Sequence, residues 1–186
     1  MRFSLLLLTL WPAIACAAER TVKFSAPMYF LSPMKAIVLT RAGEPGPGEA
    51  KHKAVATVAA LQEEMKLDGD GSFDVWFVPT DGKPIKAVAG LKPGAGQTVV
   101  KLNDHLGVIR FKGDGQPRGK LIVTAYDDPG PEEKKHVAVQ TAADVRAEMV
   151  VVPGDYAVWV VPDSGARPRR VVDKVRVLAG KTAEGE

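Results

Sequence analysis

Two histidines stand at matched places in the chain, and they are the residues best suited to metal binding or acid–base catalysis. His52 follows Lys51 and His136 follows Lys135, so each imidazole has an ammonium group beside it. A metal site needs several ligands that converge on one ion, and a nearby lysine charge opposes cation binding. We therefore interpret both histidines as solvated residues at strand edges, and we predict neither a metal nor a cofactor.

Residues 68–72, Asp-Gly-Asp-Gly-Ser, offer a second kind of chemistry. Their oxygen-bearing side chains have the spacing of a calcium loop, but Pro79 stands where such a loop needs its final Glu. A hairpin turn before a strand explains the same glycines, because glycine adopts turn conformations at no steric cost. A turn is the prediction for this segment, with calcium binding as the alternative.

Trp76 and Trp159 are candidate ligand-binding residues, because they occupy the same place in two similar segments. These are 73–79 (Phe-Asp-Val-Trp-Phe-Val-Pro) and 156–162 (Tyr-Ala-Val-Trp-Val-Val-Pro). Side chains alternate along a strand, so Trp76 falls on the face opposite the two phenylalanines of its segment. An exposed, repeated Trp can stack on a sugar ring or anchor a protein partner. The alternative is that each ring packs under a loop or against the other half of the chain.

The C-terminal region is rich in positive charge and is the second candidate binding surface. Its cations are Arg167, Arg169, Arg170, Lys174, Arg176 and Lys181. An anionic wall polymer, a lipid head group or an acidic protein would suit these charges, whereas we expect no nucleic-acid partner for an exported protein. A solvated edge strand, protected from aggregation by its charges, accounts for the same residues.

The composition of the 186 residues excludes several classes of protein. Hydrophobic residues at 46% and charged residues at 25% are globular values, which argue against disorder and coiled coil. Lys and Arg (25) barely exceed Asp and Glu (22), and the single Cys excludes a disulfide framework and a cysteine-based zinc site. The sequence also lacks a nucleophile elbow, an HExxH, a P-loop and a CxxC motif, so we predict that the protein is not an enzyme.

Residues 1–18 have the features of a signal peptide. Arg2 precedes an apolar stretch at 3–11, and alanines between positions 13 and 18 offer cleavage sites. The apolar stretch is shorter than the roughly 20 residues that cross a bilayer, and no later stretch is long enough. We predict a protein that is secreted, periplasmic or at the cell surface, with no transmembrane segment.

Cys16 leaves two fates open for the exported chain. Ala13-Ile-Ala-Cys16 is a degenerate form of the bacterial lipobox, whose first position is usually Leu, so a lipid anchor at Cys16 is one outcome. Cleavage after Ala17 or Ala18 is the other, and it removes Cys16 with the signal peptide. In that second case the exported protein contains no cysteine.

The chain contains two copies of one module, displaced by about 84 residues. Besides the tryptophan segments, the copies share Pro45-Gly-Pro47 with Pro129-Gly-Pro131, Lys51-His52 with Lys135-His136, and Ala95-Gly96 with Ala179-Gly180. We therefore divide the chain into a signal peptide at 1–18, module 1 at 19–105 and module 2 at 106–186.

Alternating apolar residues and β-branched runs between Gly and Pro predict about seven short strands in each copy. The predicted fold class is therefore all-β, with two tandem immunoglobulin-like β-sandwich modules. Residues 54–65 are ambiguous, and we interpret them as strand with one helical turn. Module 1 ends in an evident strand at 99–102, whereas module 2 stops at Ala-Glu-Gly-Glu after Thr182. We predict from this difference that the second sandwich lacks its last strand.

The segments 71–79 and 154–162, each followed by Gly, Pro and Ala-Gly-x-Thr, share a pattern with a known group of modules. They resemble the carboxypeptidase regulatory-like, or transthyretin-like, β-sandwich modules of bacterial secreted and surface proteins. The resemblance implies a transthyretin-like sandwich that serves as a structural spacer or a binding domain. One enzymatic branch of that fold ends in Tyr-Arg-Gly-Ser, a motif that is absent from this sequence.

These observations lead to two hypotheses of function. The first is a non-enzymatic, secreted or surface-associated structural or binding protein, with an extracellular protein or a polysaccharide as partner. The alternative is a carbohydrate or cell-wall-polymer binding protein that uses Trp76, Trp159 and the basic edge of Arg167, Arg169 and Arg170. Exposed tryptophan rings would favour the alternative, and buried rings would favour the first hypothesis.

Overall fold

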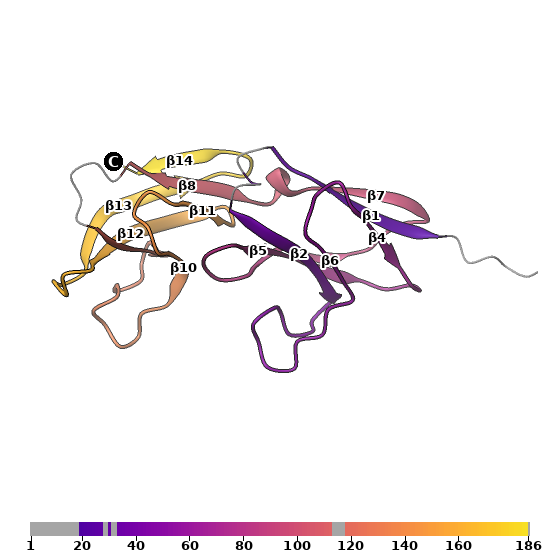
Figure 1. The fold of residues 1–186 in the computed structure, drawn as a ribbon, viewed down its shortest axis with the longest axis horizontal. Helices are drawn as coiled ribbons and strands as arrows, with labels where there is room; N and C mark the ends of the chain where they lie inside the picture. Colours follow the sequence, from indigo (N-terminus) through magenta and orange to yellow (C-terminus); the bar gives the residue numbers. More distant parts are fainter. Residues whose placement is uncertain (1–18, 28–29, 31–32, 113–117, 186) are drawn as a thin grey trace, which may run out of the picture.

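The computed structural model of the chain describes residues 19–27, 30, 33–112 and 118–185 (Figure 1). The predicted signal peptide and Cys16 lie outside the described residues. The regular structure is almost entirely β-strand, and the strands form four sheets. They build two β-sandwiches that lie end to end along the longest axis (Figure 1). Within the described ranges, no helix is long and apolar enough to span a bilayer.

Strands β1 to β7 build the sandwich of module 1. One sheet has the order β4-β1-β7 and consists of β1 (Arg20–Ser25), β4 (Glu64–Leu67) and β7 (Gly96–Lys101). The other has the order β3-β2-β5-β6 and consists of β2 (Met34–Arg41), β3 (Ala56–Val58), β5 (Phe73–Pro79) and β6 (Ile85–Leu91). A short 3-10 turn, η2 (Leu102–Asp104), leads into module 2.

Strands β8 to β14 build the sandwich of module 2. One sheet has the order β11-β8-β14 and consists of β8 (Gly107–Phe111), β11 (Glu148–Val151) and β14 (Thr182–Gly185). The other has the order β10-β9-β12-β13 and consists of β9 (Gly119–Ala125), β10 (Ala138–Ala142), β12 (Gly154–Pro162) and β13 (Arg169–Val177). The strand orders of the two modules correspond one to one, so the sequence repeat is also a repeat of topology.

The last strand of module 2 is present, so the prediction that the second sandwich lacks it is wrong. β14 pairs in parallel with β8, with Thr182 opposite Val108 and Gly185 opposite Phe111. β7 pairs with β1 in the same parallel manner in module 1. After Thr182, β14 contains only Ala, Glu and Gly, which have low strand preference, and strand pairing is made by backbone groups that every residue supplies. Side-chain patterns therefore do not reveal this strand.

Residues 54–65 span one short strand, a turn and the start of a second strand. β3 ends at Val58, a turn follows, and β4 begins at Glu64 in the opposite sheet. Leu61, within the turn, is only 7% exposed and belongs to the core of module 1. Packing of this side chain outweighs the helical preference of the surrounding Ala-Leu-Gln-Glu.

The core lies between the two sheets of each module, as the alternation of apolar and polar residues along the strands predicts. Phe73 and Phe77 of β5 are fully buried, as the spacing predicts. Burial of one such side chain contributes ~1.5–3 kcal/mol to folding. The core of module 1 also includes Val108 and Val150, which belong to β8 and β11 of module 2. Apolar packing is therefore continuous across the junction of the modules.

Candidate functional site

Trp76 lies on the outer face of β5 and is nevertheless buried, with 8% of its surface exposed. Its Nε1 donates a hydrogen bond to Oγ1 of Thr40 on β2, at 3.1 Å. A Cβ placed on Gly46 would lie 2.3 Å from the ring, so the backbone of the β2–β3 loop rests directly on the indole. The Lys86 ammonium group of β6 lies 4.8 Å from the ring centre. Trp76 is thus enclosed by a strand hydroxyl, a cation and a covering loop.

Trp159 has the same surroundings in module 2. Its Nε1 donates to Oγ1 of Thr124 on β9 at 3.2 Å, and a Cβ on Gly130 would lie 2.3 Å from the ring. The Arg170 guanidinium of β13 takes the place of the lysine, 5.6 Å from the ring centre. Trp159 is half-buried. Each tryptophan ring therefore packs under a loop of its own module, which is one of the two arrangements that the sequence left open.

The covering loops of the two modules contain the same turns. In module 1, the Glu49 N–H donates to the Gly46 carbonyl and the His52 N–H to the Glu49 carbonyl. In module 2, Glu133 and His136 repeat both hydrogen bonds. Both loops project from the same side of the molecule (Figure 1). The shared Pro-Gly-Pro segments therefore bring glycine, the residue without a Cβ, onto each indole.

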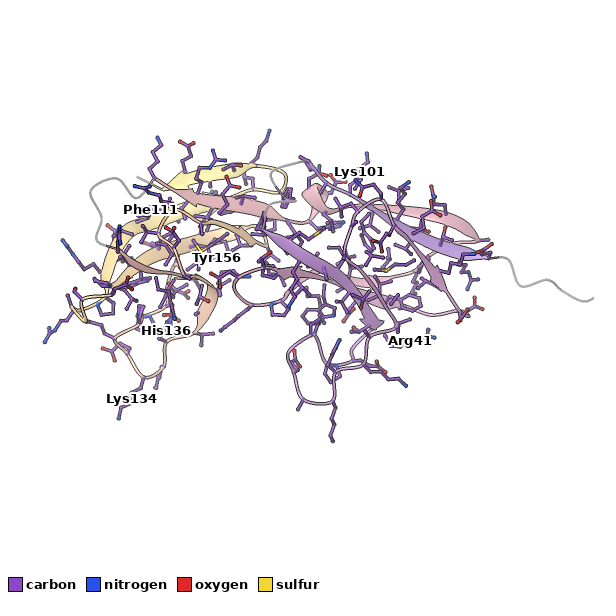
Figure 2. All side chains as sticks on the ribbon, in the orientation of Figure 1. Arg41, Lys101, Phe111, Lys134, His136 and Tyr156 are labelled. Atoms are coloured by element: carbon purple, nitrogen blue, oxygen red, sulfur yellow. The ribbon has the colours of Figure 1, made fainter. Side chains whose placement is uncertain are left out.

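The two repeated histidines lie in these loops and not at strand edges. His52 Nδ1 is 3.2 Å from the Pro45 carbonyl oxygen, whereas His136 Nδ1 is 3.2 Å from Oδ1 of Asp128. Figure 2 shows His136 and Lys134 on the β9–β10 loop. Both imidazoles are half-buried. In the part of the chain that the structure describes, no group of three His, Cys, Asp or Glu could hold a metal ion.

The segment 68–72 connects β4 to β5, which belong to opposite sheets, so it is not the predicted hairpin turn, and its Asp70 faces two arginines. The Arg20 guanidinium forms an ion pair with the Asp70 carboxylate and donates to the Gly69 carbonyl. Arg41 Nη1 donates to the Asp70 carbonyl oxygen at 3.0 Å. These contacts fix the segment against β1 and β2.

Asp74 is a buried carboxylate that the sequence analysis did not single out. It lies beside Trp76 on the outer face of β5 and is 3% exposed. It accepts hydrogen bonds from the N–H groups of Gly43 (3.2 Å) and Gly90 (2.9 Å), and from Lys86 Nζ (2.6 Å). Burial alone would raise the pKa of this carboxyl, but the three hydrogen bonds outweigh burial and lower the pKa. The sequence did contain one sign of this buried carboxylate, namely a charged residue within the otherwise apolar segment 73–79.

Asp128 fastens the covering loop of module 2 in a comparable way. Its carboxylate accepts hydrogen bonds from the N–H groups of Gly130 and Val137, each at 2.8 Å, and contacts His136. Burial opposes ionisation, yet these contacts prevail and the pKa of Asp128 is lowered. Module 2 has Ala157 at the strand position of Asp74. The loops of the two modules are therefore held by carboxylates from different elements.

The basic C-terminal residues divide into exposed and engaged side chains. Arg167, in the β12–β13 turn, and Arg169, at the start of β13, are exposed. Arg170 contacts Trp159 and also donates from Nη2 to the carbonyl oxygens of Tyr126 (3.2 Å) and Asp173 (2.6 Å). All three arginines are exposed, and of these the structure brings Arg170 together with Trp159.

Tyr126, at the end of β9, is an exposed aromatic residue that the sequence analysis missed. Its surface is 45% exposed, and its ring centre lies 5.5 Å from the Arg170 guanidinium and 4.8 Å from Lys174 Nζ. The corresponding residue in module 1 is Ala42. Because Tyr126 falls outside the repeated motifs, comparison of the copies pointed to the shared Trp instead.

Asp155 links the cations of β13 to β12. Lys174 Nζ lies 3.0 Å from its carboxylate, and Arg176 forms two hydrogen bonds with it at 2.8 and 3.0 Å. The hydrogen bonds from Arg176 and Lys174 hold the pKa of Asp155 well below its usual range. These contacts tie the cations on the outer face of β13 to β12.

The β5–β6 turn of module 1 contacts β10 of module 2 through Gln140, which is 2% exposed. Gln140 Oε1 accepts from the Lys83 N–H at 2.8 Å, and Nε2 donates to the Lys83 carbonyl at 2.7 Å. A Cβ on Gly82 would lie 2.3 Å from this amide oxygen, so glycine is required at the closest approach. Asp81 Oδ2 accepts from the Ala143 N–H at 2.6 Å. The turn is thereby fixed onto module 2.

Two cavities lie near this contact. One, of about 400 Å³, lies between the modules, with Thr80 and Asp81 on one side and Arg146 and Glu148 on the other. The second, of about 410 Å³, lies in module 2, with Arg146 and Asp163 in its lining. Neither lining contains a histidine.

No family model matches the chain, and no curated protein matches its sequence. Two solved structures align with 90% of the chain: the Bacillus anthracis TIE protein, at 10% identity and a TM-score of 0.28, and a leucine-rich repeat protein from Bacteroides thetaiotaomicron, at 13% identity and a TM-score of 0.24. The chain spans 33% of the first and 25% of the second. At these values the similarity assigns the chain to no family.

Proposed function

We propose that the chain is a non-enzymatic structural and binding protein, secreted or associated with the cell surface, in which two β-sandwich modules are held in one orientation. The observation that carries this proposal is the Gln140–Lys83 contact, whose two hydrogen bonds join module 2 to a turn of module 1. A flexible linker would leave such groups to water, and paired buried polar groups favour a single arrangement. A fixed pair of modules is what a spacer or a presenting scaffold requires.

The environment of the repeated tryptophans supports a structural role for the repeated motif. Trp76 is buried, bonded to Thr40 and covered by Gly46. A ring enclosed in this way anchors the loop above it and presents little surface to a sugar. The repeat of this packing at Trp159 suggests that both loops are positioned for display on one side of the molecule.

Polymer binding is the second candidate function, and one observation favours it. Tyr126 is an exposed ring with two cations beside it, on the same face as Trp159 and Arg170. This surface, rather than the covered Trp76, is the part of the molecule that suits a ligand outside the cell.

Rotational diffusion tests the proposed function. The exported protein, purified from cells that express the full chain, should give one rotational correlation time by NMR relaxation for amides of both modules. Gln140→Ala should make the correlation times of the two modules differ slightly, because the turn loses both hydrogen bonds to Gln140 while the Asp81–Ala143 bond and the apolar packing of the junction remain. Gln97→Ala, an exposed glutamine bonded to Glu64 within module 1, is the control and should leave one time. Independent tumbling of the unaltered modules, or retention of the chain in the cytoplasm, would contradict the proposal.

A further inference from the structure

The outer face of module 2 carries a row of aromatic and cationic side chains. We call Tyr126, Trp159, Arg170 and Lys174 the aromatic–cation row. The Arg170 guanidinium lies 5.5 Å from the Tyr126 ring centre and 5.6 Å from that of Trp159, and Lys174 Nζ lies 4.8 Å from that of Tyr126. These separations are within the range of cation–π attraction. Both cations are therefore held at defined places beside an exposed ring.

Module 1 serves as an internal control for what the fold itself needs. It has the same topology and the same covered Trp, with Lys86 opposite Trp76 where module 2 has Arg170 opposite Trp159. It has Ala42 at the place of Tyr126. The sandwich forms without a ring at this place, so packing does not account for the 45% exposed Tyr126. An exposed aromatic side chain that the fold does not need is a candidate for binding.

Exposed arginines beside the row favour an anionic ligand. The cations are Arg167, Arg169, Arg170, Lys174 and Arg176, and the nearby carboxylates, equal in number, are Asp127, Asp128, Asp155, Asp163 and Asp173. Asp128, Asp155 and Asp173 contact His136, Lys174 and Arg176, and Arg170, whereas Arg167 and Arg169 are exposed and form no ion pair with another described residue. Among the described residues, Nη1 of Arg170 donates no hydrogen bond, although Nη2 and Nε are engaged. Guanidinium groups with free donors suit carboxylates, which they bind through paired hydrogen bonds.

The row continues into a shallow groove, which favours an extended ligand. The groove has a volume of about 450 Å³ and is lined by Pro153, Gly154, Asp155, Arg176, Val177 and Leu178. It lies at the end of β13 away from Trp159, since Gly154 pairs with Val177 and Trp159 with Arg170. β13 has nine residues, so the row and the groove extend over ~30 Å of strand. A chain of linked units fits this length better than a small molecule does.

We propose that the aromatic–cation row and the adjoining groove bind an acidic polysaccharide, a chain of sugars that carry carboxylate groups. The carboxylates pair with Arg170, Lys174 and the exposed arginines, while the open part of the Tyr126 ring packs against the apolar face of a sugar. This inference rests on the proposed function, since it names the ligand and the surface of a binding protein outside the cell.

Affinity electrophoresis with polygalacturonate as the probe tests the inference. The exported protein, made from the full chain, should be retarded by polygalacturonate, should be released by high salt, and should migrate unchanged through neutral dextran. Sedimentation with phosphatidylserine-containing vesicles distinguishes a lipid surface. Binding to these vesicles without binding to polygalacturonate overturns the inference, as does equal retardation by dextran and polygalacturonate.

Matched variants test the surface itself. Tyr126→Ala should weaken polygalacturonate binding by ~10-fold, and Lys174→Ala should weaken it and reduce its salt dependence. Tyr126→Ala should fold, because module 1 forms with Ala42, and its urea midpoint checks this. Lys101→Ala, on β7 of module 1 (Figure 2), should bind like the unaltered protein. Unchanged affinity of both row variants overturns the inference. If the protein is exported and its modules tumble together but it does not bind polygalacturonate, this inference alone is overturned. If the modules tumble independently, the proposed function is contradicted.

Discussion

The Gln140 side-chain amide pairs with both backbone groups of Lys83, at 2.8 Å to the nitrogen and 2.7 Å to the carbonyl oxygen. One side chain of module 2 thus supplies the two hydrogen bonds that a neighbouring strand would give to the turn of module 1. Because the amide is almost fully buried, these hydrogen bonds are less weakened by water than they would be at the surface. The relative placement of the modules depends on this residue together with the Asp81–Ala143 hydrogen bond and the apolar packing across the junction.

Gln140→Ala should therefore destabilise the protein. It removes both hydrogen bonds between the Gln140 amide and the Lys83 backbone, and one such bond contributes ~0.5–1.5 kcal/mol. Urea unfolding followed by circular dichroism gives the free energy. Gln97→Ala is the matched control, since its amide is exposed, and should change the stability by less than ~0.5 kcal/mol. Equal effects of the two substitutions would mean that the contact between the modules is energetically neutral.

Gly46→Ala should destabilise module 1 by forcing the covering loop away from Trp76. The new Cβ would lie 2.3 Å from the indole, and such overpacking costs ~1–3 kcal/mol. Gly94→Ala is the control, because a Cβ there meets nothing within 4 Å. Thermal unfolding measures both variants. A Gly46→Ala protein as stable as Gly94→Ala would show that the loop is free to move off the ring.

Tryptophan emission reports on the two covered rings separately. In exported protein that lacks Trp11, as verified by mass spectrometry, Trp159→Phe leaves only Trp76, whose emission should be blue-shifted and poorly quenched by acrylamide. Trp76→Phe leaves only Trp159, which is half-buried and should be quenched more readily. Strong quenching of Trp76 would contradict the closed arrangement of the β2–β3 loop.

Acid should destabilise the protein through Asp74. The folded state lowers the pKa of this carboxyl below its unfolded value of about 3.9. Its contribution to stability is therefore complete above that value and is lost as the pH falls through the lower, folded pKa. Urea midpoints measured from pH 6 down to about pH 2 should decline, and Asp74→Asn should decline less steeply. Asp163→Asn, in an exposed turn, is the control; identical slopes for all three proteins would contradict the assignment.

Most of the fold could be predicted from the sequence, because a repeat doubles the signal of every element. The alternation in 73–79 placed Phe73 and Phe77 in the core and Trp76 on the other face, as the structure has them. The strand β14 could not be predicted, because after Thr182 its residues Ala, Glu and Gly show no apolar alternation and no β-branched side chain. Parallel pairing of the last strand with the first is likewise invisible in a local pattern.

The candidate surfaces were predictable only in part. The repeat pointed to Trp76 and Trp159, which share a packing role, and the basic run pointed to Arg170. Tyr126 and Gln140 were not predictable, because each occurs in one copy alone and acts through contacts far along the chain. Residues that differ between the two copies give each module its own contacts. A comparison that looks for shared residues does not detect them.

Gln140 also affects whether molecules of this protein could join end to end into a filament. The matching position in module 1, opposite Leu39 as Gln140 is opposite Val123, is Ala56. The β12–β13 turn of one molecule would therefore meet a methyl group, and no amide, on the β3 edge of another. The contact that joins the modules within a chain cannot be repeated between chains. Although the architecture is modular, this contact does not support a head-to-tail filament.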